Sequence, residues 1–409
     1  MSAGGARHAA LAPLRRRNAA CLLLARFSAT LAWQMLAVAV GWHVYALTRD
    51  PLALGFVGLC EFLPFVLLLL VGGHAADVME RRALASRAYA IVMLCALALL
   101  AYAMAAGPRA WPIYLIVGVF GAARAFWSPA MQSILPGLVP RDELAPTVAL
   151  YTMMYQTAAA VGPLLGGVLY LVGAPVVYGA CLLLFTSTLL LIRFIDADTR
   201  PPAPPEVGSA QRFLEGLRFV RHNELLLGAL SLDLFAVLFG GAVALLPIFA
   251  RDLLHTGPVG LGLLRAAPAM GAGLAALALA FRPLRAHAGR ALLGGVAVFG
   301  VCMIVFGLSR SVTLSFFALL VSGGGDMVSV YVRGILLPLA TPDALRGRVS
   351  AVNSMFIGAS NELGEFESGL TASWFGTVPS VVAGGLLTLV VAGSWALLFP
   401  ALRRLHHLR

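Results

Sequence analysis

The sequence contains no lysine and few charged residues of any kind. All 29 basic residues are arginine, and only 11% of the 409 positions are charged, whereas 60% are hydrophobic. Without lysine there can be no phosphate-binding loop of the GxxxxGK(S/T) type, so nothing indicates direct coupling to ATP. A nucleic-acid-binding protein would need a clustered basic face with aromatic residues, which is lacking. The formal charge of +11 therefore needs another explanation.

Cysteine and histidine are too few and too scattered to indicate a metal site or a disulfide framework. The five cysteines lie in apolar runs without CxxC spacing, and the eight histidines are dispersed over separate segments and the terminal tails. Neither a metal centre nor a nucleophile with its base is indicated, so we expect no enzyme and no cofactor. The loops are too short to hold an appended soluble domain, which argues against a non-transporting sensor.

Long hydrophobic runs dominate the sequence. A helix needs about 20 mostly apolar residues to cross a bilayer, and twelve such runs alternate with polar or Gly/Pro breaks. The first run is too long for the core of a signal peptide, so we expect a retained signal anchor. The sequence thus predicts an all-α membrane protein with twelve transmembrane helices. Their expected spans are 19–47, 53–74, 84–106, 111–136, 145–172, 175–195, 224–250, 259–281, 289–308, 313–337, 349–374 and 379–401.

The distribution of arginine predicts how these helices are oriented. With a cytoplasmic N-terminus, 21 of the 29 arginines lie in inside segments, four in outside loops and four within helices. This asymmetry follows the positive-inside rule. Both termini are therefore expected in the cytoplasm, and the positive charge reflects membrane topology.

A polar segment containing "DTRPPAPPEVGSAQ" divides the twelve helices into two sets of six. At an offset of 202, Gly121 and "LP" at 135–136 recur as Gly323 and "LP" at 337–338, which indicates two pseudo-symmetric six-helix bundles. Parallel repeats of this kind are typical of transporters, whose substrate site lies between the halves. The expected regions are an N-terminal tail at 1–18, bundles at 19–195 and 224–401, a linker at 196–223 and a C-terminal tail at 402–409.

Two short motifs resemble those of the major facilitator superfamily. "GGHAADVMERR" is similar to its signature loop, although Val78 and Glu80 replace a usual basic residue and glycine, and "GPLLGG" at 162–167 is similar to its exporter and antiporter motif. The matching positions are Gly73, Asp77, Arg81, Arg82, Gly162, Pro163, Gly166 and Gly167.

The resemblance extends over nearly the whole chain and is strongest to the subfamily that contains the enterobactin exporter and related secretion proteins. It implies a major facilitator fold and a monomer in the inner (plasma) membrane. It also implies secondary active export of a small molecule, such as a siderophore, drug or metabolite, by alternating access and proton antiport. Import by proton symport stays open, because the direction of transport rests on resemblance alone.

Each motif also has a physical interpretation of its own. Asp77 can accept hydrogen bonds at a cytoplasmic helix end and so latch a gate, whereas Arg81 and Arg82 can equally well serve only to orient the chain. In "GPLLGG", proline bends the helix and the glycines allow another helix to approach closely, which fits either a sealing helix or generic packing.

Charges inside the predicted helices are expensive and by default functional. The repeat aligns Arg26 with Asp233 and Arg124 with Asp326. In the architecture that the resemblance implies, these positions line the central cavity, so two arginines would face two aspartates. An aspartate that loses its arginine when the halves separate could then bind a proton. The alternatives are static ion pairs or pairs within one half, such as Asp326 with Arg333.

The stretch "NELGEFESG" at 361–369 places carboxylates in another predicted helix. Glu362 and Glu365 share a face, and like charges there favour one bound proton. The competing interpretation is a structural network with Arg265 or Arg333. Aromatic and glutamine side chains of the first and fourth helices are candidate cavity walls, although most such aromatics simply pack or face lipid. These wall candidates are Trp33, Gln34, Phe126, Trp127 and Gln132.

Overall fold

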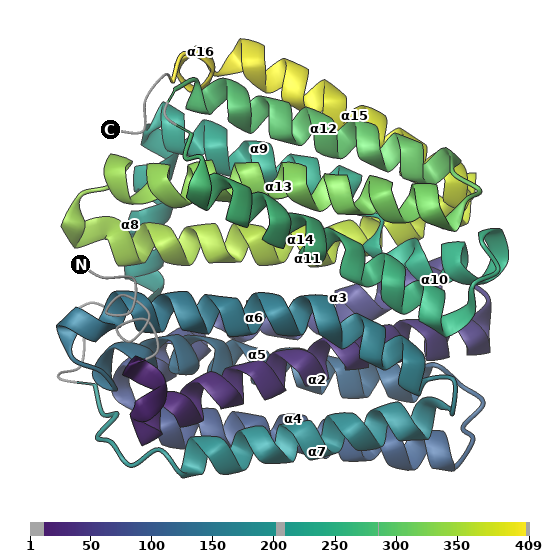
Figure 1. Cartoon of the computed structure of the whole chain (residues 1–409), viewed down its shortest axis with the longest axis horizontal. Helices are drawn as coiled ribbons and strands as arrows, with labels where there is room; N and C mark the ends of the chain where they lie inside the picture. Colours follow the sequence, from purple (N-terminus) through teal and green to yellow (C-terminus); the bar gives the residue numbers. More distant parts are fainter. Residues whose placement is uncertain (1–11, 202–208, 285, 406–409) are drawn as a thin grey trace. The chain divides into compact units, whose positions relative to one another are not determined.

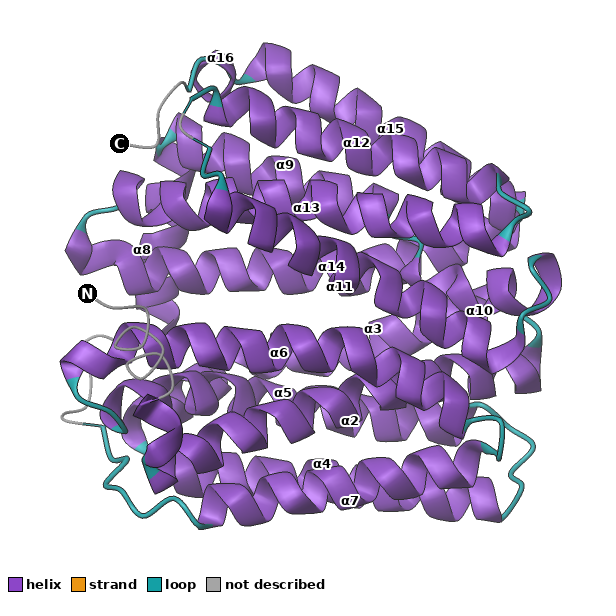
Figure 2. Cartoon of the chain, viewed as in Figure 1, coloured by secondary structure: helices purple, strands orange, loops and turns teal. Residues whose placement is uncertain are grey.

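The computed structural model describes residues 12–201, 209–284 and 286–405, and these ranges form helices and connecting loops without a strand (Figure 2). The all-α prediction is confirmed. Parts of the predicted tails 1–18 and 402–409, part of the linker 196–223 and Arg285 lie outside the described residues.

Ten helices of the described chain are long and apolar enough to cross a membrane. They are α2 (Arg17–Thr48), α3 (Pro51–Val78), α4 (Arg81–Met104), α5 (Trp111–Ile134) with η2 (Leu135–Gly137), α7 (Ala174–Arg193), α9 (Glu224–Gly240) with its extension to Leu253, α11 (Gly257–Phe281), α12 (Ala288–Leu308), α13 (Val312–Ala340) and α15 (Thr377–Leu398). Helices α6 (Arg141–Leu169) and α14 (Arg346–Phe375) match the two remaining predicted spans in position but are more polar. Short helices η1 (Ala12–Arg15), η5 (Asp343–Leu345) and α16 (Pro400–Arg403) complete these elements.

The chain divides into two compact units. Unit 1 comprises Met1–His43 and Leu63–Ser209, and unit 2 comprises Val44–Phe62 and Ala210–Arg409. In unit 1, α4 packs against α5 and α7 (Figure 1). The residues that α4 buries recur every three or four positions, as expected for a helix with one face in a core. They are Leu84, Ala85, Ala88, Tyr89, Val92, Cys95, Ala96 and Leu99.

In unit 2, helices α11, α13, α12 and α15 pack in that order, and α9 packs against α14 and α15 (Figure 1). Small residues permit the closest of these contacts. A Cβ atom on Gly323 of α13 would lie 2.0 Å from the Pro268 carbonyl oxygen of α11. Such contacts bring backbones together in a medium where van der Waals packing, rather than exclusion of water, drives helix association.

Residues 44–62 belong to unit 2 because they pack on η4 (Phe249–Leu253) and α14. The hydroxyl of Tyr45 donates a hydrogen bond to Asp252, and Arg49 Nη1 lies 3.5 Å from the same carboxylate. A Cβ atom on Gly369 would lie 2.7 Å from Cα of Gly55. Helices α2 and α3 therefore each contribute residues to both units.

The span predicted at 224–250 corresponds to the membrane-span candidate Glu224–Leu253, but the helix is interrupted within it. Helix α9 ends at Gly240, and η3 (Val243–Leu245), α10 (Leu246–Ile248) and the π-helical η4 follow. Two consecutive glycines weaken the helix here, and Gly241 takes an extended conformation. The hydroxyl of Ser368 donates a 2.6 Å hydrogen bond to the Gly241 carbonyl oxygen, which satisfies a backbone group exposed by the break.

A helix that the sequence analysis did not predict, α8 (Ser209–His222), lies within the segment assigned as linker. Phe213, Leu217 and Val220 are spaced to share one face, and they pack into the hydrophobic core of unit 2. Glu215 on this helix forms an ion pair with Arg348 at the start of α14. The C-terminal part of the predicted linker is therefore a helix that packs within unit 2.

Candidate functional site

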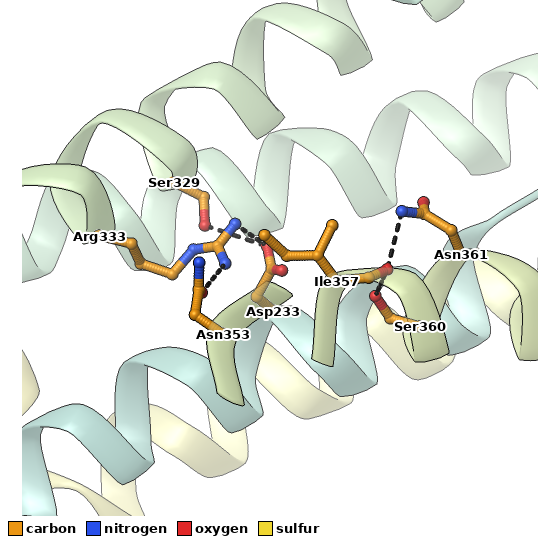
Figure 3. Close-up of polar contacts among 7 residues, drawn as sticks. All are labelled: Asp233, Ser329, Arg333, Asn353, Ile357, Ser360 and Asn361. Carbon is orange, nitrogen blue, oxygen red and sulfur yellow. Dashed lines mark hydrogen bonds and ion pairs between the residues drawn. The ribbon is translucent and has the colours of Figure 1, made fainter. Parts of the chain in front are cut away.

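A buried ion pair joins two helices of unit 2. Asp233 of α9 and Arg333 of α13 are each 5% exposed, and Arg333 Nη2 lies 2.7 Å from Asp233 Oδ1. Ser329 donates a 3.4 Å hydrogen bond to the same oxygen, and Arg333 Nη1 donates one of 3.4 Å to Asn353 of α14 (Figure 3). This network ties α9, α13 and α14 together.

The pair differs from both pairings that the sequence raised for these residues. Arg333 contacts Asp233 within one unit, whereas the repeat aligned Asp233 with Arg26, and the alternative within one half joined Arg333 to Asp326. Asp326 lies within electrostatic range of both Asp233 and Arg333. The pairings of Arg26 with Asp233 and of Arg124 with Asp326 would join the two units and stay predictions.

A cavity of about 180 Å³ lies in unit 2 beside the break that follows α9. Most of its wall is apolar and includes Phe299, Met303 and Leu319. The groups that can carry charge or form hydrogen bonds in its wall are Arg265, Ser322, Asp326, Asn361 and Glu365. Two of the predicted coupling residues, Asp326 and Glu365, thus line the same cavity, whereas Glu362 is buried and is not among the lining residues.

The positively charged side chain in the wall of this cavity is Arg265 of α11. It is attracted by the carboxylates of Glu365 and of Glu61, which lies in the part of α3 that belongs to unit 2. Of the two arginines in the network interpretation of "NELGEFESG", Arg265 is the one within electrostatic range of Glu365, while Arg333 is engaged by Asp233. Both interpretations of this stretch stay predictions. The Ile357 carbonyl oxygen accepts two hydrogen bonds, one of 2.8 Å from the side-chain amide of Asn361 and one of 3.0 Å from the hydroxyl of Ser360 (Figure 3). Glu61 was missed, although a carboxylate in an apolar run is a visible signal.

In unit 1, the two arginines that the sequence places within predicted helices, Arg26 and Arg124, lie against aromatic rings. The Arg124 guanidinium lies 4.5 Å from the Trp33 ring and 4.6 Å from the Phe65 ring. The Arg26 guanidinium lies 5.0 Å from the Tyr151 ring and 4.7 Å from the Tyr155 ring, both of α6. These distances fit cation–π contacts, which stabilise a cation where water is scarce.

The predicted wall residues have different environments. Trp33 meets Trp127 edge to face with ring centroids 6.0 Å apart, and Trp127 also stacks on Tyr89 at 5.3 Å. Phe126 is half-buried and Gln132 is exposed. Gln34 lies at a close helix crossing, because a Cβ atom added to Gly162 would lie 2.6 Å from the Cβ atom of Gln34. The structure thus brings Trp33 and Trp127 together.

The motif "GPLLGG" lies where α6 crosses α2. A Cβ atom on Gly166 would lie 3.0 Å from Cα of Met35, and Pro163 and Gly167 are buried in the same helix. The close approach that the glycine spacing predicted is therefore present in unit 1.

The signature loop caps helices of unit 1 with its arginines. Arg81 Nη1 donates a 3.0 Å hydrogen bond to the Ser133 carbonyl oxygen near the end of α5, and Arg82 Nη1 donates one of 2.5 Å to that of Ile195 after α7. Cations at helix C-termini satisfy free carbonyl groups and complement the helix dipole. Asp77 lines a pocket of about 250 Å³ with Glu80 and Arg200.

Gly73, the matching glycine of the signature loop, has nothing within 4 Å of the position where a Cβ atom would lie. Its neighbour Gly72 makes the close contact instead, since a Cβ atom there would lie 2.0 Å from the Ala125 carbonyl oxygen of α5. Motif matching missed Gly72, because the rotation of α3 against α5 is a tertiary feature.

Comparison with known proteins agrees with this architecture. The family model described as Transmembrane secretion effector matches residues 8–407. The Enterobactin exporter EntS of Citrobacter koseri is 24% identical over 384 residues, which cover 94% of this chain and 92% of that protein. EntS of Shigella boydii is 25% identical over 385 residues, with the same coverage.

Solved transporter structures share the fold. A POT family transporter in complex with 5-aminolevulinic acid aligns with a TM-score of 0.73 and 11% identity, covering 95% of this chain and 97% of that one. A bacterial homolog of the human lysosomal transporter Spinster, in an inward-facing and unoccupied conformation, aligns with a TM-score of 0.71 and 16% identity, covering 95% and 98%. The chain therefore belongs to the transmembrane secretion effector family of the major facilitator superfamily, and it is a multi-pass membrane transporter rather than an enzyme.

Proposed function

We propose that this protein exports a small organic molecule across the plasma membrane in exchange for protons, by alternating access. The similarity to exporters supports the direction of transport. The observation that carries the coupling is the cavity of unit 2, where Asp326 and Glu365 lie with Arg265 in one largely apolar wall. Both termini lie in the cytoplasm, a monomer is sufficient, and the ion gradient replaces a cofactor.

The balance of charge around this cavity favours proton binding. Glu365 and Glu61 share Arg265, and Asp326 lies near a second arginine, Arg333, that Asp233 already engages. Carboxylates thus outnumber guanidinium groups among these residues. Like charges in a medium of low dielectric constant cannot all ionise without nearby cations, so the excess negative charge is relieved when an acid binds a proton.

Transport into inside-out vesicles tests the direction. We expect a lumen more acidic than the medium to drive accumulation of the cargo, because protons leaving the lumen would exchange for cargo that enters. A panel of siderophores, drugs and metabolites would identify that cargo. Import by proton symport predicts the reverse, with cargo leaving an acidic lumen, and that result would overturn export.

The coupling residue is tested by Asp326→Asn. We expect this variant to insert and to exchange labelled for unlabelled cargo, but to lose accumulation driven by a pH gradient. Glu143→Gln is the control, since Glu143 forms an exposed ion pair with Arg16 in unit 1 and is not among the cavity-lining residues. Undiminished gradient-driven accumulation in Asp326→Asn would refute the assignment.

A further inference from the structure

Four buried polar atoms of unit 1 have no hydrogen-bond partner among the described residues. They are Nε of Arg26, the hydroxyl oxygens of Tyr89 and Tyr151, and Nε1 of Trp127. The Arg26 guanidinium lies 5.0 Å from the Tyr151 ring, and Tyr89 is within electrostatic range of both Arg26 and Tyr151. Since Tyr89 also stacks on Trp127 at 5.3 Å, the four residues form one contiguous cluster, which we call the donor cluster.

The chemistry of the donor cluster indicates what its partner must be. Buried polar atoms in folded proteins are nearly always hydrogen-bonded, so four unsatisfied atoms on neighbouring residues need an explanation. The arginine and tryptophan nitrogens can only donate, and tyrosine hydroxyls donate readily. The partner is therefore an acceptor.

The positive charge of Arg26 indicates, in addition, that this acceptor is an anion. Its guanidinium is always protonated, and it makes no ion pair within the part of the chain that the structure describes. The guanidinium carbon instead lies 5.0 Å and 4.7 Å from the ring centroids of Tyr151 and Tyr155, and Nε–H of Arg26 is left without a hydrogen-bond acceptor among the described residues. Tyr89 and Trp127 are buried, with exposed fractions of 1% and 6%, whereas Arg26 and Tyr151 are partly buried.

Aromatic surface surrounds this donor cluster. Trp127 connects it to Trp33, whose ring in turn lies under the guanidinium of Arg124. Aromatic rings pack favourably edge to face or offset against other rings. The surroundings thus match a flat, aromatic molecule better than an inorganic ion.

We propose that the donor cluster binds an anionic oxygen group, a carboxylate or a phenolate, carried on an aromatic ring. Arg26, Tyr89 and Tyr151 donate hydrogen bonds to the anion, and Trp127 supplies the fourth donor. This inference rests on the proposed function and specifies its substrate class, namely aromatic acids.

Isothermal titration calorimetry on the purified full-length protein in detergent tests the site. The probes are 2-naphthoate and 2-naphthamide, which share a shape but differ in charge. We expect 2-naphthoate to bind at least about tenfold more tightly. Tyr89→Phe and Tyr151→Phe each remove one hydrogen bond to a charged group, so each should weaken 2-naphthoate binding by about tenfold or more. Arg26→Gln should abolish the preference for the anion.

Tyr178→Phe is the matched control. This tyrosine is equally buried in unit 1, but its hydroxyl lies 3.1 Å from Nδ1 of His43 and thus has a partner. We expect its loss to lower the melting temperature and to leave 2-naphthoate affinity unchanged. Tyr89→Phe removes an unsatisfied hydroxyl, so the ligand-free melting temperature should stay equal or rise while affinity falls. That contrast separates a binding role from a folding defect.

Equal affinity for the two probes, no binding of 2-naphthoate, or unchanged affinity in Tyr89→Phe would overturn the site and leave ordered water as the partner of these atoms. The titration requires no membrane and no proton gradient. Binding without gradient-driven transport would therefore count against the proposed function alone, and transport without this binding against the donor cluster alone.

Discussion

The buried charge of Arg333 is stabilised by a carboxylate on another helix, that of Asp233. Asp233→Ala would leave Arg333 charged and buried without its carboxylate, and losing one partner of a buried pair costs about 3–5 kcal/mol of stability. We therefore expect a large fall in melting temperature in detergent, with Glu143→Ala at an exposed ion pair as the control that changes little.

The double variant Asp233→Leu with Arg333→Met isolates the cause. Replacing both charges by apolar side chains removes the stranded charge, so much of the lost stability should return. Losses that simply add in the double variant would show that the two side chains stabilise the fold independently, contrary to the ion pair.

Glu365 should behave differently, because Arg265 is shared between two glutamates, whereas Arg333 makes its 2.7 Å ion pair with Asp233. Arg265 retains Glu61 when Glu365 becomes glutamine, so the melting temperature of Glu365→Gln should change little. The pH dependence of cargo binding between about pH 5 and 9 should shift, since a proton-binding group has been removed. A large melting loss with an unmoved pH profile would instead identify Glu365 as a structural brace.

At the residue scale, the sequence could predict which side chains matter but not what they contact. Asp326 and Glu365 are visible because a carboxylate within an apolar run is expensive. Their surroundings depend on how four or more helices are rotated against each other, which no local pattern contains. Tyr89 and Tyr151 were missed for the same reason, whereas Glu61 was missed although its carboxylate in an apolar run is visible. The ion pair of Arg333 with Asp233 was not among the pairings that the sequence suggested.

The contact between α3 and α5 depends on one glycine of two neighbours. A Cβ atom on Gly72 would overlap the Ala125 carbonyl oxygen at 2.0 Å, whereas the same atom on Gly73 meets nothing within 4 Å. Gly72→Ala should therefore force the helices apart and lower the melting temperature. Gly73→Ala should leave it unchanged or raise it slightly, because alanine favours a helix over glycine. Equal effects of the two substitutions would contradict this packing.

At the scale of elements, helices that follow hydropathy were predictable and irregularities were not. The span predicted at 259–281 corresponds to α11 at Gly257–Phe281, because polar or glycine-containing breaks bound the apolar run. The break after Gly240 lies inside a continuous apolar run and leaves no trace in hydropathy. Helix α8 did leave a signal, the spacing of Phe213, Leu217 and Val220, in a segment dominated by proline and polar residues.

On the scale of the whole chain, fold class and family follow from long apolar runs, the internal repeat and the motifs, and the comparisons confirm them. The compact units are a different division from the predicted bundles at 19–195 and 224–401. Their boundaries fall within α2 and α3, since residues 44–62 pack with unit 2. Sequence could not show this, because a repeat reports common ancestry of segments and not the contacts that each half makes.

The repeat also predicts which charges of the two halves correspond, and charge swaps can test it. Arg124→Asp and Asp326→Arg should each abolish transport, and the double variant should recover part of it. Swapping Arg26 with Asp233 is the contrast, because Asp233 is already engaged by Arg333 within unit 2 and its reversal would place two arginines together. We therefore expect recovery for the first pair and none for the second, measured as gradient-driven accumulation in vesicles at matched protein levels. Recovery in neither pair would reject the repeat as a guide to charge pairing, and recovery in the second alone would show that Asp233 exchanges Arg333 for Arg26 during transport.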